Sequence, residues 1–150
     1  MKNIFDKNTT AEIIDRINHL SASSQPVWGK MSVGKMLAHC SVTYELIYDN
    51  KHPKANGAKR FLLKLFIKNT VVNEKPYKKS SPTAPEFIIK DDRNFDHEKK
   101  RLIDYITKTR QLGENYFEGK ESNSFGKLTK TEWNNMFYKH LDHHLTQFGV

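Results

Sequence analysis

Apolar residues recur along this chain at the three- and four-residue spacing of an α-helix, and no other feature limits the fold as strongly. No run of alternating apolar and polar residues, the pattern typical of a half-buried β-strand, appears beside them. Helical segments are predicted to begin near Thr9, Ser32, Asn56, Phe95 and Thr129. We therefore expect an all-α protein.

Helix start and stop signals accompany these segments. Thr9 with Glu12, and Thr129 with Glu132, fit the capping-box pattern, in which threonine and glutamate side chains each accept a hydrogen bond from the other's backbone amide. Gly149 is placed to end the last helix. The third predicted helix is expected to direct its large apolar side chains inward, namely Phe61, Leu62, Leu65 and Phe66.

A long segment from Asn73 to Asp92 interrupts the helical pattern and contains three prolines. Proline fixes φ and removes a backbone donor, so we expect an extended loop here. Loops of this length are uncommon in compact domains and often serve as lids or binding loops. A surface strap over apolar helices is the other interpretation. The expected architecture is one domain over residues 1–150, an up-and-down four-helix bundle of antiparallel helices with a short accessory helix and this Pro-containing loop.

The composition narrows the class of partner. The 150 residues carry 25 Lys and Arg against 17 Asp and Glu, a net charge of +8. Because only five of these cations are Arg and the Lys are scattered, a solvated surface is favoured over nucleic-acid binding. Cys40 is the only cysteine, which excludes a disulfide framework. With neither a signal sequence nor an apolar run that could span a bilayer, we expect a cytoplasmic protein without a membrane partner.

Histidines supply the candidate chemistry, although three of the seven, His19, His52 and His97, are expected to be exposed and inert. On a helix, residues i and i+4 are neighbours on one face, so His140 and His144 can bind one metal ion together. His140 and His143, at i and i+3, are the competing pair. The spacing favours His140 and His144, because they follow Met136 at intervals of four residues and so lie on the same side of the helix as the apolar stripe.

His39 is the candidate third ligand, since it lies on another amphipathic helix, where Cys40 is expected to serve core packing. Three neutral imidazoles suit a divalent ion such as Zn²⁺, Ni²⁺ or Fe²⁺ and leave an open coordination position. Helical spacing brings Thr43, Tyr44 and Gln147 near this site. A metal-free reading, in which the three histidines are hydrogen-bonded core residues, is the structural alternative.

The chain resembles the DinB/YfiT-like metalloenzyme superfamily, in particular a bacterial branch of domains of unknown function. The resemblance rests on five blocks, Trp28–Ser32, Met36–Cys40, Pro82–Pro85, Phe125–Thr129 with Glu132–Trp133, and Tyr138–Gly149. It implies an up-and-down four-helix bundle with three metal-binding histidines, which match His39, His140 and His144. Some members of the superfamily resemble thiol-dependent transferases and others metal-dependent hydrolases, but for this branch the resemblance supplies neither a substrate nor a reaction type.

The sequence therefore predicts a divalent-metal protein that acts on a small molecule, as a metal-dependent hydrolase or a thiol-dependent transferase using a low-molecular-weight thiol. The metal would activate a water or bind a thiolate. Neither a glycine-rich phosphate loop nor a GxSxG elbow is present to suggest other chemistry. We expect a monomer or homodimer. The alternative function is a non-catalytic basic helical module that binds nucleic acid or another polyanion.

Overall fold

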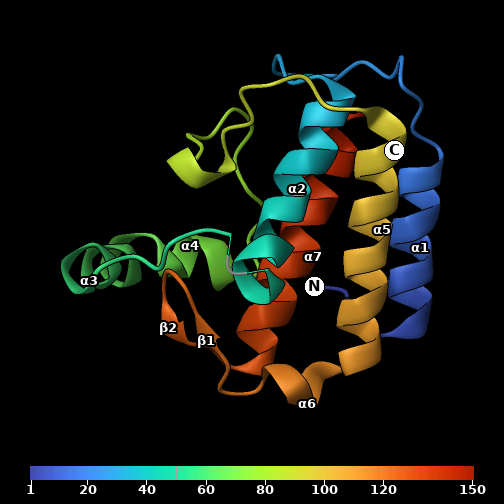
Figure 1. The fold of residues 1–150 in the computed structure, drawn as a ribbon. Helices are drawn as coiled ribbons and strands as arrows, with labels where there is room; N and C mark the ends of the chain where they lie inside the picture. Colours follow the sequence, from blue (N-terminus) through green and yellow to red (C-terminus); the bar gives the residue numbers. More distant parts are fainter. Residues whose placement is uncertain (50) are drawn as a thin grey trace.

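The structure is a computed structural model that describes residues 1–49 and 51–150, and it is mostly helical (Figure 1). The helices are α1 (Lys7–Asn18), α2 (Val33–Tyr48), α3 (Gly57–Phe66), α4 (Lys68–Val72), α5 (Phe95–Leu112), α6 (Glu114–Phe117) and α7 (Lys130–Gln147), with a 3-10 turn, η1, at Pro85–Phe87. Two short strands, β1 (Glu121–Ser122) and β2 (Gly126–Lys127), form an antiparallel hairpin that the sequence analysis did not predict. The all-α fold class is confirmed.

Four long helices, α1, α2, α5 and α7, pack side by side around the core. Figure 1 shows α1 and α7 running in one direction and α2 and α5 in the other. Gly34, near the start of α2, lies against the Arg93 carbonyl just before α5, and Tyr48 at the end of α2 hydrogen-bonds Thr109 near the end of α5. The simple alternation of antiparallel helices was therefore wrong for α2 and α5, because the connection over residues 49–94 returns the chain to the starting end.

The helix ends follow local hydrogen bonding. Thr129 caps α7 with the predicted capping box, since its hydroxyl accepts from the Glu132 amide and the Glu132 carboxylate accepts from the Thr129 amide. The predicted box at Thr9 was wrong. The Asp6 carboxylate instead accepts from the amides of residues 8 and 9 and starts α1 earlier. A charged cap near the positive end of the helix dipole is favoured over a neutral one.

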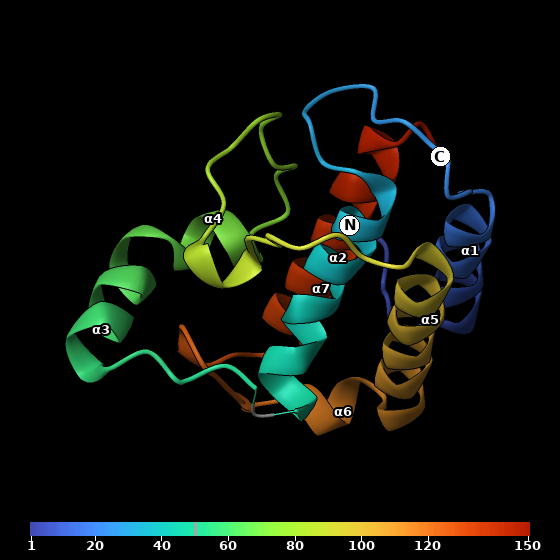
Figure 2. The ribbon, with the colours of Figure 1, turned by 45° about the horizontal axis from the view of Figure 1, so that its top comes forward.

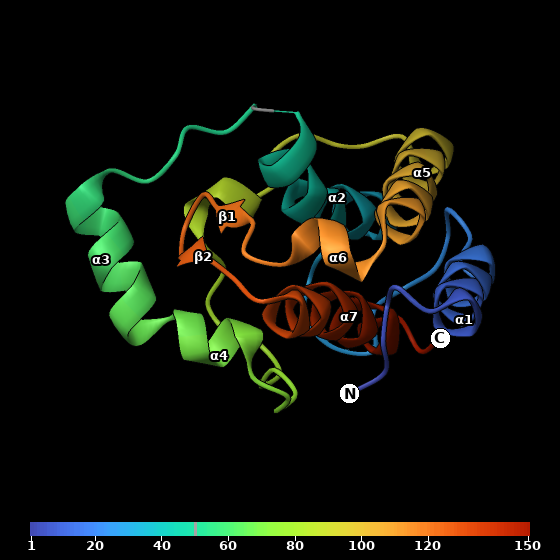
Figure 3. The same cartoon turned by 90° about the horizontal axis from the view of Figure 1, so that it is seen from below.

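Aromatic side chains fill the core between α7 and its neighbours. Phe137 stacks between Trp133 and Tyr44, with ring centroids 5.5 and 5.1 Å away, and packs edge-on against Phe117 of α6 at 5.4 Å. All four side chains are at most 1% exposed. At this end of the molecule, which Figure 3 shows from below, α6 packs against α5 and α7, and the hairpin lies to the side.

Helices α3 and α4 lie to one side of the four long helices (Figures 1 and 2). The expectation that α3 faces the core with its large apolar residues was wrong, because Phe61, Leu62, Leu65 and Phe66 are 54–68% exposed. Leu63, on the opposite side of α3, is partly buried against the core instead. No helix within residues 1–49 and 51–150 is long and apolar enough to cross a membrane.

Candidate metal centre

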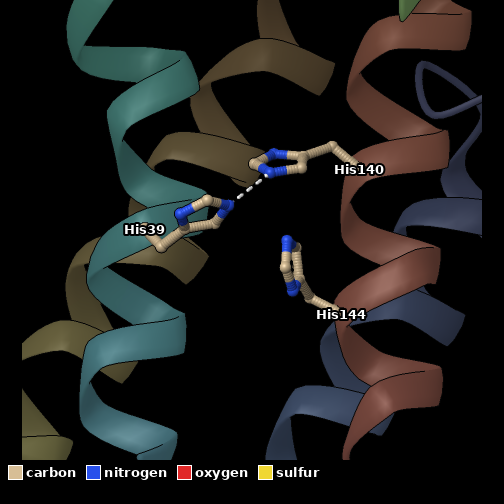
Figure 4. Close-up of side chains that lie close together, drawn as sticks. All are labelled: His39, His140 and His144. Carbon is tan, nitrogen blue, oxygen red and sulfur yellow. Dashed lines mark hydrogen bonds between the residues drawn. The ribbon is translucent and has the colours of Figure 1, made fainter. Parts of the chain in front are cut away.

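Three histidines from two helices converge between α2 and α7 (Figure 4). His39 comes from α2 and His140 and His144 from α7, and one ring nitrogen of each lies within 4.8 Å of the other two. The ring centroids are 4.9 Å apart for His39 and His140, 4.5 Å for His39 and His144, and 4.9 Å for His140 and His144. The structure therefore brings together the pair singled out by its helical spacing, His140 and His144, and the candidate third residue, His39.

The ring of His39 is oriented by the long loop. Its Nδ1 lies 2.9 Å from the Phe87 carbonyl oxygen, to which it donates. The Phe87 ring packs on His39 and on His140, with centroids 5.3 and 5.7 Å away. Because the proton stays on Nδ1, the Nε2 of His39 carries a lone pair that faces the other two histidines.

The ring of His144 is held by a chain of two hydrogen bonds. Its Nδ1 donates to Gln147 Oε1 over 2.9 Å, and Gln147 Nε2 donates in turn to the Trp28 carbonyl over 2.8 Å. Gly29 makes room for this amide, because a Cβ at that position would lie 2.7 Å from Gln147 Nε2. The positive φ of +83° at Gly29 also disfavours other residues. The Nε2 of His144 is left free to bind.

His140 completes the cluster and has two accessible tautomers. Its Nδ1 is 3.0 Å from Thr43 Oγ1, and its Nε2 is 2.9 Å from the Nε2 of His39. A threonine hydroxyl can donate or accept, so His140 can carry its proton on either nitrogen. With the proton on Nδ1, all three Nε2 lone pairs face one another. In that arrangement the lone pairs repel one another and together attract a cation.

Burial keeps the three rings neutral. Desolvation lowers the pKa of His39 and His140, and it lowers that of His144 to about 3. The neighbouring imidazoles lower the pKa of His140 further. His39 and His144 are buried residues, and His140 is partly buried. Metal ions bind neutral imidazoles, so these pKa directions favour metal binding near neutral pH.

His143 borders the cluster, with its ring centroid 5.0 Å from that of His144, but it does not join the three converging rings. Its ring packs edge-on against Trp28 and Tyr77, with centroids 5.9 and 5.7 Å away, on the border of a cleft of about 650 Å³. It is absent from the group whose nitrogens lie within 4.8 Å of one another among the described residues. The geometry brings His140 together with His144 and not with His143.

Thr43 and Gln147 contact the histidines directly, but Tyr44 does not join them. Its ring stacks between Phe137 and Tyr105, and its hydroxyl is buried with no hydrogen-bond partner among residues 1–49 and 51–150. Helical spacing alone could not separate it from Thr43, which is one residue away. Tyr44 belongs to the aromatic core.

The other histidines and the cysteine are accounted for by their surroundings. His19 and His97 are exposed, as expected, whereas His52 is partly buried and lies 2.8 Å from the Glu45 carboxylate. That expectation was wrong because Glu45 extends from α2 toward the loop. Cys40 is buried in the core, where burial raises the pKa of its thiol, so it remains protonated.

Sequence reasoning missed two groups that orient the histidines, the carbonyls of Phe87 and Trp28. Backbone carbonyls carry no residue-type signal. Only indirect signals pointed to their segments, the proline-rich stretch before Phe87 and Gly29 beside Trp28.

Comparisons with known proteins place the chain in a family. Searches of curated proteins and of solved structures returned no significant match. One family model, described as a protein of unknown function (DUF1569), matches residues 4–149. The chain is therefore a member of the DUF1569 family, over almost its whole length.

Proposed function

We propose that His39, His140 and His144 bind a divalent metal ion and that this centre makes the protein a metal-dependent enzyme acting on a small molecule. One observation carries the proposal. Each Nδ1 is within hydrogen-bond distance of a protein oxygen, and the three remaining Nε2 atoms converge on one point. Partners on the second nitrogen that fix the tautomer and orientation of the ring are typical of metal-binding histidines.

The donor set fits a divalent ion better than a metal-free hydrogen-bonded cluster. His39 and His144 keep their protons on Nδ1, so only His140 can supply a proton to the centre. That proton satisfies the Nε2 of His39 and leaves the Nε2 of His144 without a donor from the described residues. A cation accepts all three lone pairs at once.

Three nitrogen ligands leave coordination positions for other molecules. When bound, a divalent ion in such a site supplies Lewis-acid chemistry and activates an oxygen or sulfur nucleophile. The residues of the chain orient the imidazoles through the Thr43 hydroxyl, the Gln147 amide and the Phe87 carbonyl. The Phe87 ring packs on His39 and His140 at one side of the centre. We propose hydrolysis or thiol-dependent group transfer as the reaction, the latter with a low-molecular-weight thiol as cosubstrate.

The packing of α1, α2, α5 and α7 supports the relation to DinB/YfiT-like four-helix bundles that the sequence resemblance implied. We propose this relation, and a cytoplasmic bacterial protein, as the wider setting of the function. A three-histidine centre between the second and the last long helix is the feature that the resemblance and the geometry share.

Metal analysis tests the proposal directly. Untagged protein, purified without chelators, is expected to contain about one equivalent of a divalent metal, and protein stripped of metal should take up Zn²⁺ or Ni²⁺ with a rise in melting temperature. Activity screens of the loaded protein against ester and amide panels, and against electrophiles with added thiols, separate hydrolase from transferase. Absence of bound metal under every loading condition would refute the centre.

A further inference from the structure

The net positive charge of this protein resides in one segment. Residues 51–79 contain nine Lys and Arg and a single acidic residue, Glu74, a net charge of +8. The rest of the chain holds 16 cations and 16 acidic residues, so it is neutral overall. Acidic residues therefore balance the cations in the rest of the chain but not in this segment. A segment this basic attracts anionic surfaces.

The same segment carries the largest group of exposed apolar side chains. Phe61, Leu62, Leu65, Phe66 and Ile67 are 45–68% exposed. From aromatic and aliphatic side chains of this size, we estimate an exposed apolar area of roughly 500 Å², at the upper end of what soluble monomers present as one patch. We call the four of these residues that belong to α3, Phe61, Leu62, Leu65 and Phe66, the α3 face.

The α3 face points away from the rest of the molecule. Phe61, Leu62, Leu65 and Phe66 share one side of the helix by its 100° rotation per residue, and Leu63, on the other side, contacts the core. Lys59 and Lys64 lie on the two borders of the apolar side. Figures 2 and 3 show α3 at the outer edge of the molecule, beyond α4.

Part of the positive charge is neutralised by weak surface pairs. Lys59 pairs with Glu86 at 2.6 Å and Lys68 with Glu132 at 2.7 Å, while Arg60 pairs with Glu121 and Lys51 with Glu45 and Asp49. Pairs between exposed side chains contribute little and exchange readily for other anions. Among residues 1–49 and 51–150, Lys54 and Lys64 form no ion pair within 4 Å. The segment therefore presents cations beside an apolar surface.

We propose that the α3 face binds the surface of a membrane rich in anionic lipids. An amphipathic helix with apolar residues on one side and Lys or Arg beside them lies in the interface between lipid headgroups and acyl chains. Phe61 and Phe66 insert into the interface, and Lys54, Lys59 and Lys64 contact lipid phosphates. Such a helix binds a membrane without crossing it, so the proposal agrees with the absence of a membrane-spanning helix in the described residues.

Two other occupants fit the observations less well. A second copy of the chain would bring two segments of charge +8 together, which is unfavourable at low salt. Nucleic acid would satisfy the cations but not the leucines, because phosphate contacts need no apolar surface. A lipid surface satisfies both kinds of side chain.

The test is vesicle co-sedimentation of the intact protein. Wild type is expected to bind phosphatidylcholine vesicles that contain phosphatidylglycerol and not vesicles of phosphatidylcholine alone. The Phe61→Ser/Phe66→Ser variant should bind at least tenfold more weakly at every salt concentration, because insertion is lost. The Lys54→Glu/Lys64→Glu variant should lose at least tenfold, and mostly at low salt.

Matched controls lie outside the segment. Val27→Ser removes an apolar side chain that is 70% exposed, and Lys7→Glu/Lys90→Glu reverses two exposed cations, so both should bind as wild type does. Equal binding by wild type and the double-Phe variant would overturn the proposal and leave only charge attraction. So would vesicle-free self-association that the double-Phe variant abolishes, or a salt-dependent gel shift with nucleic acid and no vesicle binding. Metal content reports separately on the histidine centre.

Discussion

The histidine cluster and the α3 face both depart from the usual distribution of side chains. The cluster buries polar groups, whereas the α3 face exposes apolar ones. Between α2 and α7, three imidazoles occupy a mostly buried stripe where apolar residues are usual. On α3, phenylalanines and leucines occupy positions where polar residues are usual. Burying a polar group costs free energy unless it is hydrogen-bonded, and exposing apolar area forgoes stabilisation. Stability of the fold explains neither arrangement.

The two regions differ in what completes them. The chain itself supplies a partner for the outer nitrogen of each histidine, through Thr43, Phe87 and Gln147, and leaves only the centre open. On α3, by contrast, the apolar side chains of the described segment face outward, and no comparable set of hydrogen bonds orients them. A preorganised centre of this size suits one ion and a small molecule, whereas an open face suits a large surface.

The largest expected effect compares an aromatic residue of the core with one of the α3 face. Phe137→Ala should reduce the free energy of unfolding by about 3–5 kcal/mol, because Phe137 is fully buried among other rings. Phe66→Ala, at 68% exposure, should change it by no more than about 0.5 kcal/mol. Urea titrations measure both. A large loss for Phe66→Ala would mean that the α3 face packs on the body in solution.

Metal stabilisation is the next effect in size. A ligand bound only by the folded state at a hundredfold excess over Kd stabilises it by about 2.7 kcal/mol, so Zn²⁺ or Ni²⁺ should raise the melting temperature of wild type. His144→Ala should abolish most of this gain and His143→Ala should preserve it. The reverse result would assign the ligand pair to His140 and His143. The double-Phe variant of α3 should respond as wild type does.

Substitution of the groups that orient the imidazoles should weaken metal binding without removing it. Thr43→Val and Gln147→Leu each leave one imidazole without its hydrogen-bond partner, and a 10–100-fold rise in the Kd for metal is expected. Tyr44→Phe is the matched control, since the hydroxyl that it removes has no hydrogen-bond partner in the described structure. Competition titrations with a chromophoric chelator measure the three constants. Equal effects in all three would show that packing, not orientation, governs affinity.

Acidification should act on the histidine cluster and leave α3 unaffected. In the unfolded chain histidines titrate near 6.5, whereas burial lowers the pKa of His144 in the folded protein to about 3. Stability is therefore fully present above pH 6.5 and is lost as the pH falls from there toward 3, by about 1.4 kcal/mol per pH unit for this histidine. Unfolding of metal-free protein between pH 7 and 5 measures the slope. His144→Ala should reduce the slope without abolishing it, because burial also lowers the pKa of His39 and His140, and a flat wild-type profile would contradict the burial of the rings.

The sequence predicted the parts of the centre that depend on helical spacing. His140, His144 and Gln147 lie within eight residues of one another on α7, and Thr43 follows His39 by one turn on α2, so positions within each helix follow from 100° per residue. The spacing could not show that Phe87, from a loop, would contact His39. It also could not separate Thr43 from Tyr44, because the choice between adjacent positions depends on how α2 is rotated against α7.

The fold was predictable where local hydrogen bonding decides it and less so where packing does. Thr129 and Glu132 form their capping box within four residues, so tertiary structure hardly matters. The amphipathic pattern of α3 was recognised, but a pattern indicates only that one face is apolar and not that the chain covers it. We expected no membrane partner because no apolar run is long enough to span a bilayer. That criterion detects spanning helices only and not helices that lie on the membrane surface.

The parallel course of α2 and α5 has a consequence for how the sequence can vary. Two parallel neighbours need a connection that travels back along the molecule, and here residues 49–94 provide it (Figure 1). The entropy of closing such a loop grows slowly, by only about 0.6 kcal/mol for each doubling of its length. Insertions between α2 and α4 therefore cost the core little, provided that Phe87 still reaches His39. A bundle of this kind can therefore acquire new surfaces in this stretch with little loss of stability.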